Sequence, residues 1–172
     1  MALELLGSFF VALTLGLLVW ALRKKFAAIP AWATPALAGA GLIATAIYME
    51  YSWFNRVSAA LPAQFVVANA ETATSPLRPW TFAVPVVNRF TALDGSKLAR
   101  HPERDDLVVA PVFGFARWQN PQTALMVFDC VGKRRVAVTE GMAIDANGTL
   151  TGAEWLVLEN PDGLQQAACK EG

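Results

Sequence analysis

Two long apolar runs separated by a basic tripeptide constrain this chain more than any other feature. The runs are Leu5–Leu22 and Ala31–Met49, of 18 and 19 residues, and neither contains Asp, Glu, Lys, Arg or His. About 20 apolar residues in a helix span the ~30 Å hydrocarbon core of a bilayer. Inside that core the backbone amides must bond within their own segment, so each run is expected to be helical. The sequence therefore predicts a membrane α-helical hairpin over residues 1–56, with transmembrane helices at about 5–22 and 31–51.

The basic tripeptide Arg23-Lys24-Lys25 predicts the orientation of this hairpin. Short loops rich in Lys and Arg stay in the cytoplasm, so the link 23–30 is expected inside. Both termini, and the domain after Tyr51, are then expected in the periplasm, with the hairpin in a bacterial inner membrane surrounded by lipid. A cleaved signal peptide is the alternative, but the N-terminus carries Glu4 and no basic residue before the first run, so we predict a retained helix.

Small residues recur at a spacing of four on both predicted helices. The first helix carries Ser8, Ala12 and Gly16, and the second carries Ala36, Ala40 and Ala44. Such rows let two helices approach closely. They either pack the hairpin on itself, which we favour, or present one row to the helix of a partner. The bulkier candidates for facing a partner are Phe9, Phe10, Leu13 and Leu17.

The segment after the second run is expected to leave the bilayer and become irregular. Glu50–Ala60 can extend the helix until Pro62 ends it. Residues 57–85 are predicted to be a connector, because Thr, Ser and Pro discourage long regular elements there. Phe65–Val67 could form one short strand within it. Three residues of the connector are apolar enough to lie against the domain or the membrane: Leu77, Trp80 and Phe82.

Residues 86–172 have the pattern of a small periplasmic β domain. Short β-prone runs alternate with turn signals such as Asp94-Gly95 and Ala146-Asn147-Gly148. The run Leu107–Ala116 contains Pro111, which predicts an edge strand or a bulge. Leu164–Lys170 is expected to be a short helix. The prediction is an α+β fold with a mainly antiparallel sheet of four to six strands and a C-terminal helix.

The two cysteines of the chain, Cys130 and Cys169, fall on the predicted periplasmic side, where disulfides persist. A bridge between them would close a loop of about 40 residues, which stabilises a fold by ~4 kcal/mol in the loop-entropy model. That is a large share of the ~5–15 kcal/mol typical of a domain. Two free buried thiols are the alternative, and we predict the disulfide.

The second half of the chain also carries short motifs in a characteristic order. Val127–Cys130 contains Phe-Asp-Cys and is followed by Arg134-Arg135, Asp145–Gly148, Trp155 and Ala167–Cys169. Over roughly residues 94–170 this order resembles the surface-adhesin protein E family. The resemblance implies the same domain fold and a bridge between the two cysteines. The best-known member of that family binds host matrix proteins. Members of the family usually carry a cleaved signal peptide or a lipid anchor, whereas this chain is predicted to carry two helices.

The titratable residues do not form a recognisable catalytic or metal-binding set. His101 lies in a polar stretch and is interpreted as part of a solvated loop, not as a general base. A disulfide removes both cysteines as nucleophiles or zinc ligands. Glu103, Asp105 and Asp106 could bind a cation, although a polar loop is the preferred interpretation. We therefore expect no enzyme, cofactor or metal, and the net charge of zero gives no indication of a nucleic-acid partner.

Three functions remain in competition at this stage. We favour an accessory or structural subunit of a larger inner-membrane complex, whose hairpin packs beside other integral membrane subunits and whose outer domain binds protein. The alternative is a free-standing membrane-anchored module that presents its sheet to a soluble or extracellular ligand, as the adhesin resemblance implies. An enzyme is the third, and no group of residues supports it.

Overall fold

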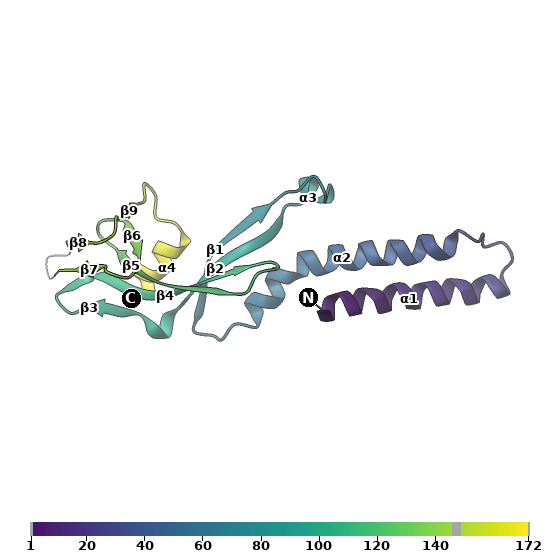
Figure 1. Ribbon diagram of the computed structural model, residues 1–172, viewed down its shortest axis with the longest axis horizontal. Coiled ribbons are helices and arrows are strands. Elements are labelled where there is room, and N and C mark those ends of the chain that lie inside the picture. The colour runs from purple at the N-terminus through teal and green to yellow at the C-terminus, as the bar shows by residue number, and fades with distance from the viewer. Residues whose placement is uncertain (1, 146–148, 172) are drawn as a thin grey trace. The chain divides into compact units, whose positions relative to one another are not determined.

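The computed structural model describes residues 2–145 and 149–171 and divides into two compact units, one ending at Asn55 and one beginning at Arg56. The predicted turn at Ala146-Asn147-Gly148 lies outside the described residues. The order of elements along the chain is shown in Figure 1.

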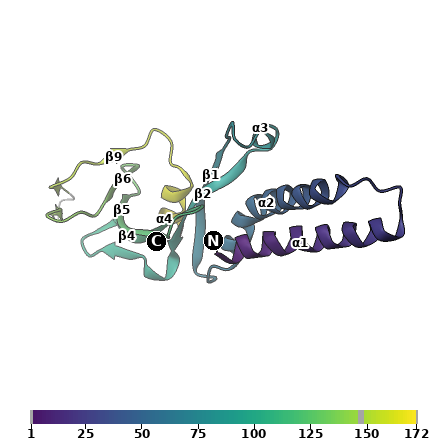
Figure 2. The ribbon, with the colours of Figure 1, turned by 45° about the vertical axis from the view of Figure 1, so that its right-hand side comes forward.

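The first unit is a hairpin of two helices, α1 (Ala2–Lys25) and α2 (Ala33–Ala59). The last turn of α2 belongs to the second unit. Both views in Figures 1 and 2 show the two helices antiparallel and side by side. Three hydroxyls within the apolar runs bond to their own helix: Ser8 donates to the Glu4 carbonyl, Thr14 to the Phe10 carbonyl and Thr45 to the Gly41 carbonyl. These bonds satisfy polar groups without water, as an apolar surrounding requires.

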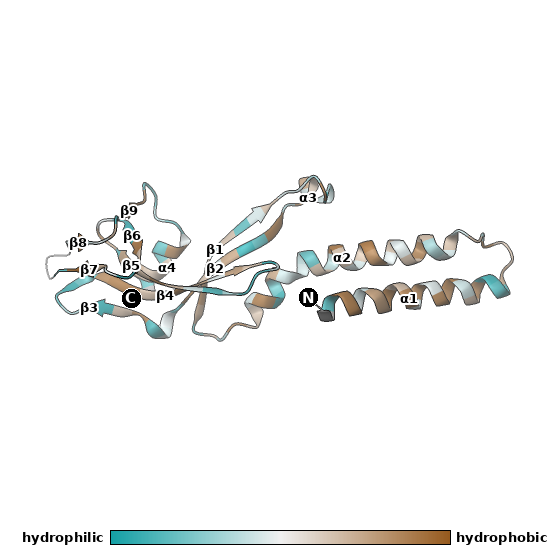
Figure 3. Ribbon diagram, in the orientation of Figure 1, coloured by the Kyte–Doolittle hydropathy of each residue, from teal (hydrophilic) through white to brown (hydrophobic). Residues whose placement is uncertain are grey.

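The two predicted helices exist, but only one has the composition of a membrane span. Glu4–Lys25 has a mean hydropathy of 2.3 and is long enough to cross a bilayer. Within the described part of the chain, α2 does not reach the same level, and it begins at Ala33 instead of residue 31. Figure 3 shows the difference as a browner α1 and a paler α2. The cause is composition, because α2 is built largely from Ala, Gly and Thr and carries Glu50 and Arg56.

The second unit is an antiparallel sheet with one helix packed on it. The main sheet has seven strands in the order β1-β2-β4-β5-β6-β9, with β3 paired to β4, so the predicted four to six strands were too few. A separate two-stranded sheet joins β7 to β8. The strands are β1 (Phe65–Ala73), β2 (Val86–Asp94), β3 (Ala99–His101), β4 (Arg104–Ala116), β5 (Gln122–Asp129), β6 (Arg134–Ala137), β7 (Ala143–Ile144), β8 (Leu150–Thr151) and β9 (Leu156–Val157).

The segment predicted to be a connector contains the first strand of the sheet. β1 pairs with β2 from Phe65↔Asp94 to Ala73↔Val86, with two irregularities in register. The prolines that suggested irregular structure are confined to the hairpin tip, where α3 (Trp80–Ala83) forms a single turn. The preceding Phe, Val and Thr residues are β-prone and free to pair. The second unit therefore begins at Arg56, not at residue 86.

Pro111 lies in the middle of the sheet, and the prediction of an edge strand was wrong. Strand β4 pairs with β5 on one side, where Pro111 is opposite Leu125. On its other side β4 pairs with β3 as far as Val109 and with β2 from Val112 onward. Pro111 thus falls at the gap between two successive partner strands, where a missing ladder hydrogen bond costs little.

The core lies between the sheet and α4 (Gly163–Glu171), the expected C-terminal helix. Leu164 and Ala168 of the helix pack on Leu93, Val108 and Phe128, all nearly inaccessible to solvent. The helix approaches β1 closely at Gly163, where an added Cβ would meet the Ala68 carbonyl oxygen, so glycine is required there.

Candidate functional site

The Phe-Asp-Cys motif at the end of β5 is the centre of a group of structural contacts. Phe128 is fully buried in the core, and Cys130 is bridged to Cys169 of α4, with the two Cα atoms 5.7 Å apart. The predicted disulfide is therefore confirmed. Asp129 lies between them with 1% of its surface exposed. Each residue of the motif thus fixes a different part of the domain.

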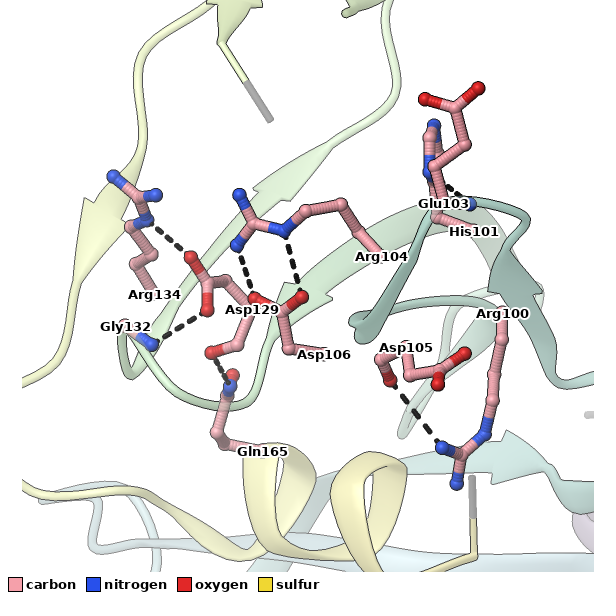
Figure 4. A network of polar contacts seen from close by, with 10 residues as sticks. All are labelled: Arg100, His101, Glu103, Arg104, Asp105, Asp106, Asp129, Gly132, Arg134 and Gln165. Carbon is pink, nitrogen blue, oxygen red and sulfur yellow. Dashed lines mark hydrogen bonds and ion pairs between the residues drawn. The ribbon is translucent and has the colours of Figure 1, made fainter. Parts of the chain in front are cut away.

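Asp129 holds the turn that follows β5. The Gly132 backbone N–H donates to its carboxylate over 2.6 Å, and Arg134 Nε donates to the other oxygen over 2.7 Å. The Asp129 carbonyl accepts from the Gln165 side chain of α4 over 2.9 Å. Figure 4 shows these three bonds converging on one residue. The two bonds to the carboxylate are charge-assisted, and such bonds are roughly twice as strong as neutral ones.

A second ion pair lies beside the first. Arg104 at the start of β4 donates from Nε to Asp106, 2.8 Å away, and a second guanidinium nitrogen contacts the same carboxylate. The hydrogen bonds from Arg104 lower the pKa of the Asp106 carboxyl below its ordinary value. Arg134, which binds Asp129, also stacks on Trp155 with its guanidinium carbon 4.7 Å from the ring centroid. Both carboxylates are thus occupied by arginines.

Asp162 fastens the start of α4. Its carboxylate accepts from the Gln165 backbone N–H at 3.0 Å, from Asn69 of β1 at 3.0 Å and from Arg135 of β6 at 2.8 Å. Burial raises the pKa of this carboxyl, but these hydrogen bonds outweigh it and hold the pKa below its ordinary value of 3.8. One side chain therefore caps the helix and joins it to two strands.

The remaining polar residues drawn in Figure 4 bond within the hairpin of β3 and β4. His101 ends β3, and its Nδ1 accepts from the Glu103 backbone N–H at 3.3 Å, so it belongs to the hairpin between β3 and β4. Asp105 contributes its backbone carbonyl to Arg100. Among residues 2–145 and 149–171, no group of three or more His, Cys, Asp and Glu is placed to hold a metal ion.

A polar hollow of about 330 Å³ lies on the sheet away from these ion pairs. Gly114 and Ala116 of β4 are among its lining residues. Arg89 and Glu71, 3.6 Å apart, stand at one side. The other lining residues are Phe90, Thr91, Phe115, Gln119, Asn120 and Gln122. The hollow offers amides and one ion pair to a ligand, and no sequence motif indicates it because its residues come from four separate segments.

The contact between α1 and α2 uses different residues of α2 from those predicted. A Cβ added to Gly41 would meet the Leu15 side chain, and the nearest neighbour of a Cβ at Gly16 would be Ala38, 3.9 Å away. The predicted row Ser8, Ala12 and Gly16 is half-buried. The predicted row Ala36, Ala40 and Ala44 is exposed, so it is not the face of α2 that meets α1.

An apolar groove of about 380 Å³ lies beside the contact between α1 and the start of α2. Its lining is Ala12, Leu13, Gly16, Leu17, Trp20 and Thr34. Leu13 and Leu17, two of the predicted partner-facing residues, thus lie on this groove. Phe9 and Phe10 are exposed and stack edge to face on each other, 6.0 Å apart.

The basic tripeptide ends α1, as expected for cations near a helix C-terminus. Lys24 also lies over the Trp20 ring, with its ammonium nitrogen 4.0 Å from the centroid. An aromatic residue next to lysines at a helix end is typical of a membrane interface.

No protein family, curated protein or solved structure matches this chain. The resemblance to the surface-adhesin protein E family stays a prediction that depends on the motif residues alone.

Proposed function

We propose that this chain is a non-catalytic accessory subunit of a bacterial inner-membrane complex. Both helices lie in the bilayer, the basic link faces the cytoplasm, and the disulfide-bridged domain is periplasmic. The disulfide supports this placement, because such bonds persist in oxidising compartments. The composition of α2 is marginal for lipid, and its packing on α1 through Gly41 reduces the surface that lipid must cover.

The observation that carries the proposal is the apolar groove lined by α1 and the start of α2. In a bilayer, apolar surface alone does not bring helices together, because lipid tails are as apolar as leucine. Close packing of complementary surfaces decides whether two helices associate in a bilayer. Gly16 and Ala12 provide a low floor, and Leu13 and Leu17 stand beside it, about half exposed. A side chain from the helix of another subunit fits such a groove better than a disordered lipid tail does.

A non-catalytic role agrees with the use of the polar residues. The most buried carboxylate of the domain, Asp129, is occupied by Gly132 and Arg134, and Asp162 is occupied by α4 and its neighbours. A general base needs a carboxylate or imidazole with a free lone pair beside a substrate. Asp129 and Asp162 are used instead to hold the fold.

The test is co-purification in mild detergent. Replacing Leu13 and Leu17 together by Ala should leave the level of the protein unchanged but release it from its membrane partners, because the walls of the groove are lost. The matched control replaces Leu6 and Leu18, which are about equally exposed and do not line the groove. Retention of the same partners by the groove variant, with loss on removal of residues 60–172, would transfer binding to the outer domain.

The second candidate is a free-standing binding module, as the adhesin resemblance implies. The observation in its favour is the polar hollow, which presents Gln119, Asn120 and Gln122 beside the Arg89–Glu71 pair. This candidate predicts a monodisperse small particle in mild detergent, whereas the accessory subunit predicts a stoichiometric complex. The same purification therefore distinguishes the two.

A further inference from the structure

The tip of the β1–β2 hairpin exposes three large apolar side chains. Leu77 is 90% exposed, Phe82 62% and Val84 58%. All three lie between Ala73, where β1 ends, and Val86, where β2 begins (Figure 1). Soluble surfaces rarely gather such residues in one small patch without a binding role.

The charge of the tip is as unusual as its apolar surface. Between Glu71 and Arg89 the sequence holds a single charged residue, Arg78. No carboxylate is present in that stretch to be repelled by anionic headgroups or to resist transfer from water. An exposed apolar patch with one arginine and a nearby tryptophan, Trp80, has the composition of segments that lie in a membrane interface.

The tip also satisfies most of its own backbone, which a surface entering lipid must do. Thr81 is fully buried and organises the turn: its hydroxyl donates to the Arg78 carbonyl over 2.7 Å and accepts from the Ser75 N–H over 2.9 Å. The N–H groups of Arg78, Thr81, Phe82 and Val84 donate to carbonyls within the tip. Pro76, Pro79 and Pro85 have no N–H to satisfy.

We propose that this tip inserts into the interfacial region of the bilayer that anchors the chain, with Leu77, Phe82 and Val84 among the lipid and Arg78 at the headgroups. The inference rests on the membrane anchoring proposed above. The hairpin is long enough to make this contact. Helix α2 continues about 14 Å beyond Glu50 before the short link to β1. Strand β1 rises about 30 Å over nine residues, which is more than the distance that α2 extends.

Insertion matters because a tethered domain is otherwise free to turn about its link. A second membrane contact holds the sheet at one height and orientation above the bilayer. Each apolar side chain is weak on its own, but the anchor keeps the tip at high effective concentration next to the surface. The tip would therefore remain inserted although the isolated segment would not bind vesicles tightly.

The test uses the full chain in vesicles of three parts phosphatidylcholine to one part phosphatidylglycerol. Leu77→Cys, labelled under non-reducing conditions with a polarity-sensitive fluorophore, reports the tip, and Glu159→Cys reports an exposed loop. Lipids carrying a spin label on the acyl chain should quench the tip fluorophore several-fold more than the loop fluorophore. Adding Phe82→Asp to the Leu77→Cys variant should return the tip to the level of the loop.

A third label, Leu13→Cys on α1, separates this proposal from the anchoring on which it rests. Quenching at Leu13 without quenching at Leu77 overturns tip insertion and leaves the anchor in place. Failure of the chain to float with the vesicles overturns both. An apolar reading at Leu77 in native membranes but not in pure lipid vesicles assigns the tip to a protein partner and overturns the lipid contact.

Discussion

At the scale of single residues, the Asp129 carboxylate holds the turn after β5 through its bonds to Gly132 and Arg134. Replacing it by Asn keeps its shape but removes the charge that binds Gly132 and Arg134. Hydrogen bonds to a charged group contribute about 1.5–3 kcal/mol, so we expect the free energy of unfolding to fall by that order. Arg134 limits the loss, since it is one-third exposed and stacked on Trp155. Thermal unfolding of the full chain in detergent measures the effect.

The matched control is Glu71→Gln, which breaks the pair between Glu71 and Arg89. Both side chains of that pair are more than half exposed. Exposed pairs contribute little, so the melting temperature should hardly change. Equal melting temperatures for Asp129→Asn and wild type would show that the turn is held by other contacts.

Asp162 makes the stability of the domain depend on pH. Its folded-state pKa lies below the ordinary value of 3.8, so protons bind more readily to the unfolded chain. The stabilisation is fully present above that ordinary value and is lost as pH falls through the folded-state pKa. We expect Asp162→Asn to lower the urea midpoint at pH 7 and to approach wild type at pH 3. A difference that is constant between pH 7 and pH 3 would contradict this account.

At the scale of elements, the disulfide ties α4 to the end of β5. Replacing both Cys130 and Cys169 by Ser opens a loop of 39 residues in the unfolded chain. The loop-entropy model then predicts a loss of about 4 kcal/mol. Urea unfolding of the double variant should show this as a lower midpoint, and reduction of the wild-type chain should reproduce it. A midpoint equal to that of the oxidised wild type would mean that the bond adds no stability.

The helix hairpin depends on Gly41. A Cβ there would clash with a methyl of Leu15, whereas the neighbouring Ala40 is exposed. Gly41→Leu should therefore separate the helices and lower the accumulated level of the protein, and Ala40→Leu should be tolerated. Immunoblots of membrane fractions compare the two variants. Equal levels would indicate that the helices pack elsewhere, as the small-residue row through Ala40 predicts.

The sequence predicted the kinds of element better than their contacts. Helix α1, the disulfide and α4 follow from local patterns and from the predicted compartment, and these three features are present in the structure. The packing face of α2 does not follow, because small residues occur on several sides of a uniformly apolar helix and periodicity cannot select one. Strand β1 was predicted only as the short run Phe65–Val67, because prolines at the tip were allowed to decide the character of the residues up to Ala73. The bond from Gln165 of α4 to the Asp129 carbonyl was missed because it joins residues 36 positions apart in the sequence.

At the scale of the whole molecule, the proposed membrane topology predicts a link between orientation and disulfide formation. The tripeptide Arg23-Lys24-Lys25 is expected to keep the link 23–30 in the cytoplasm, which places the domain in an oxidising compartment. Replacing all three by Glu removes the positive charges that hold this orientation. We expect a fraction of the chains to insert with the domain in the reducing cytoplasm, where Cys130 and Cys169 remain thiols.

Alkylation of intact cells, followed by the mass of the purified chain, measures that fraction directly. Wild type should take up no alkylating agent without reductant, since both cysteines are bridged. A charge-preserving control that combines Arg23→Lys, Lys24→Arg and Lys25→Arg should behave as wild type. Alkaline phosphatase fused after Gly172 should lose activity in the Glu variant in parallel with the gain in alkylation. If the Glu variant keeps its bridge and the phosphatase keeps its activity, the basic tripeptide does not set the topology. The disulfide would then be the one remaining support for a periplasmic domain.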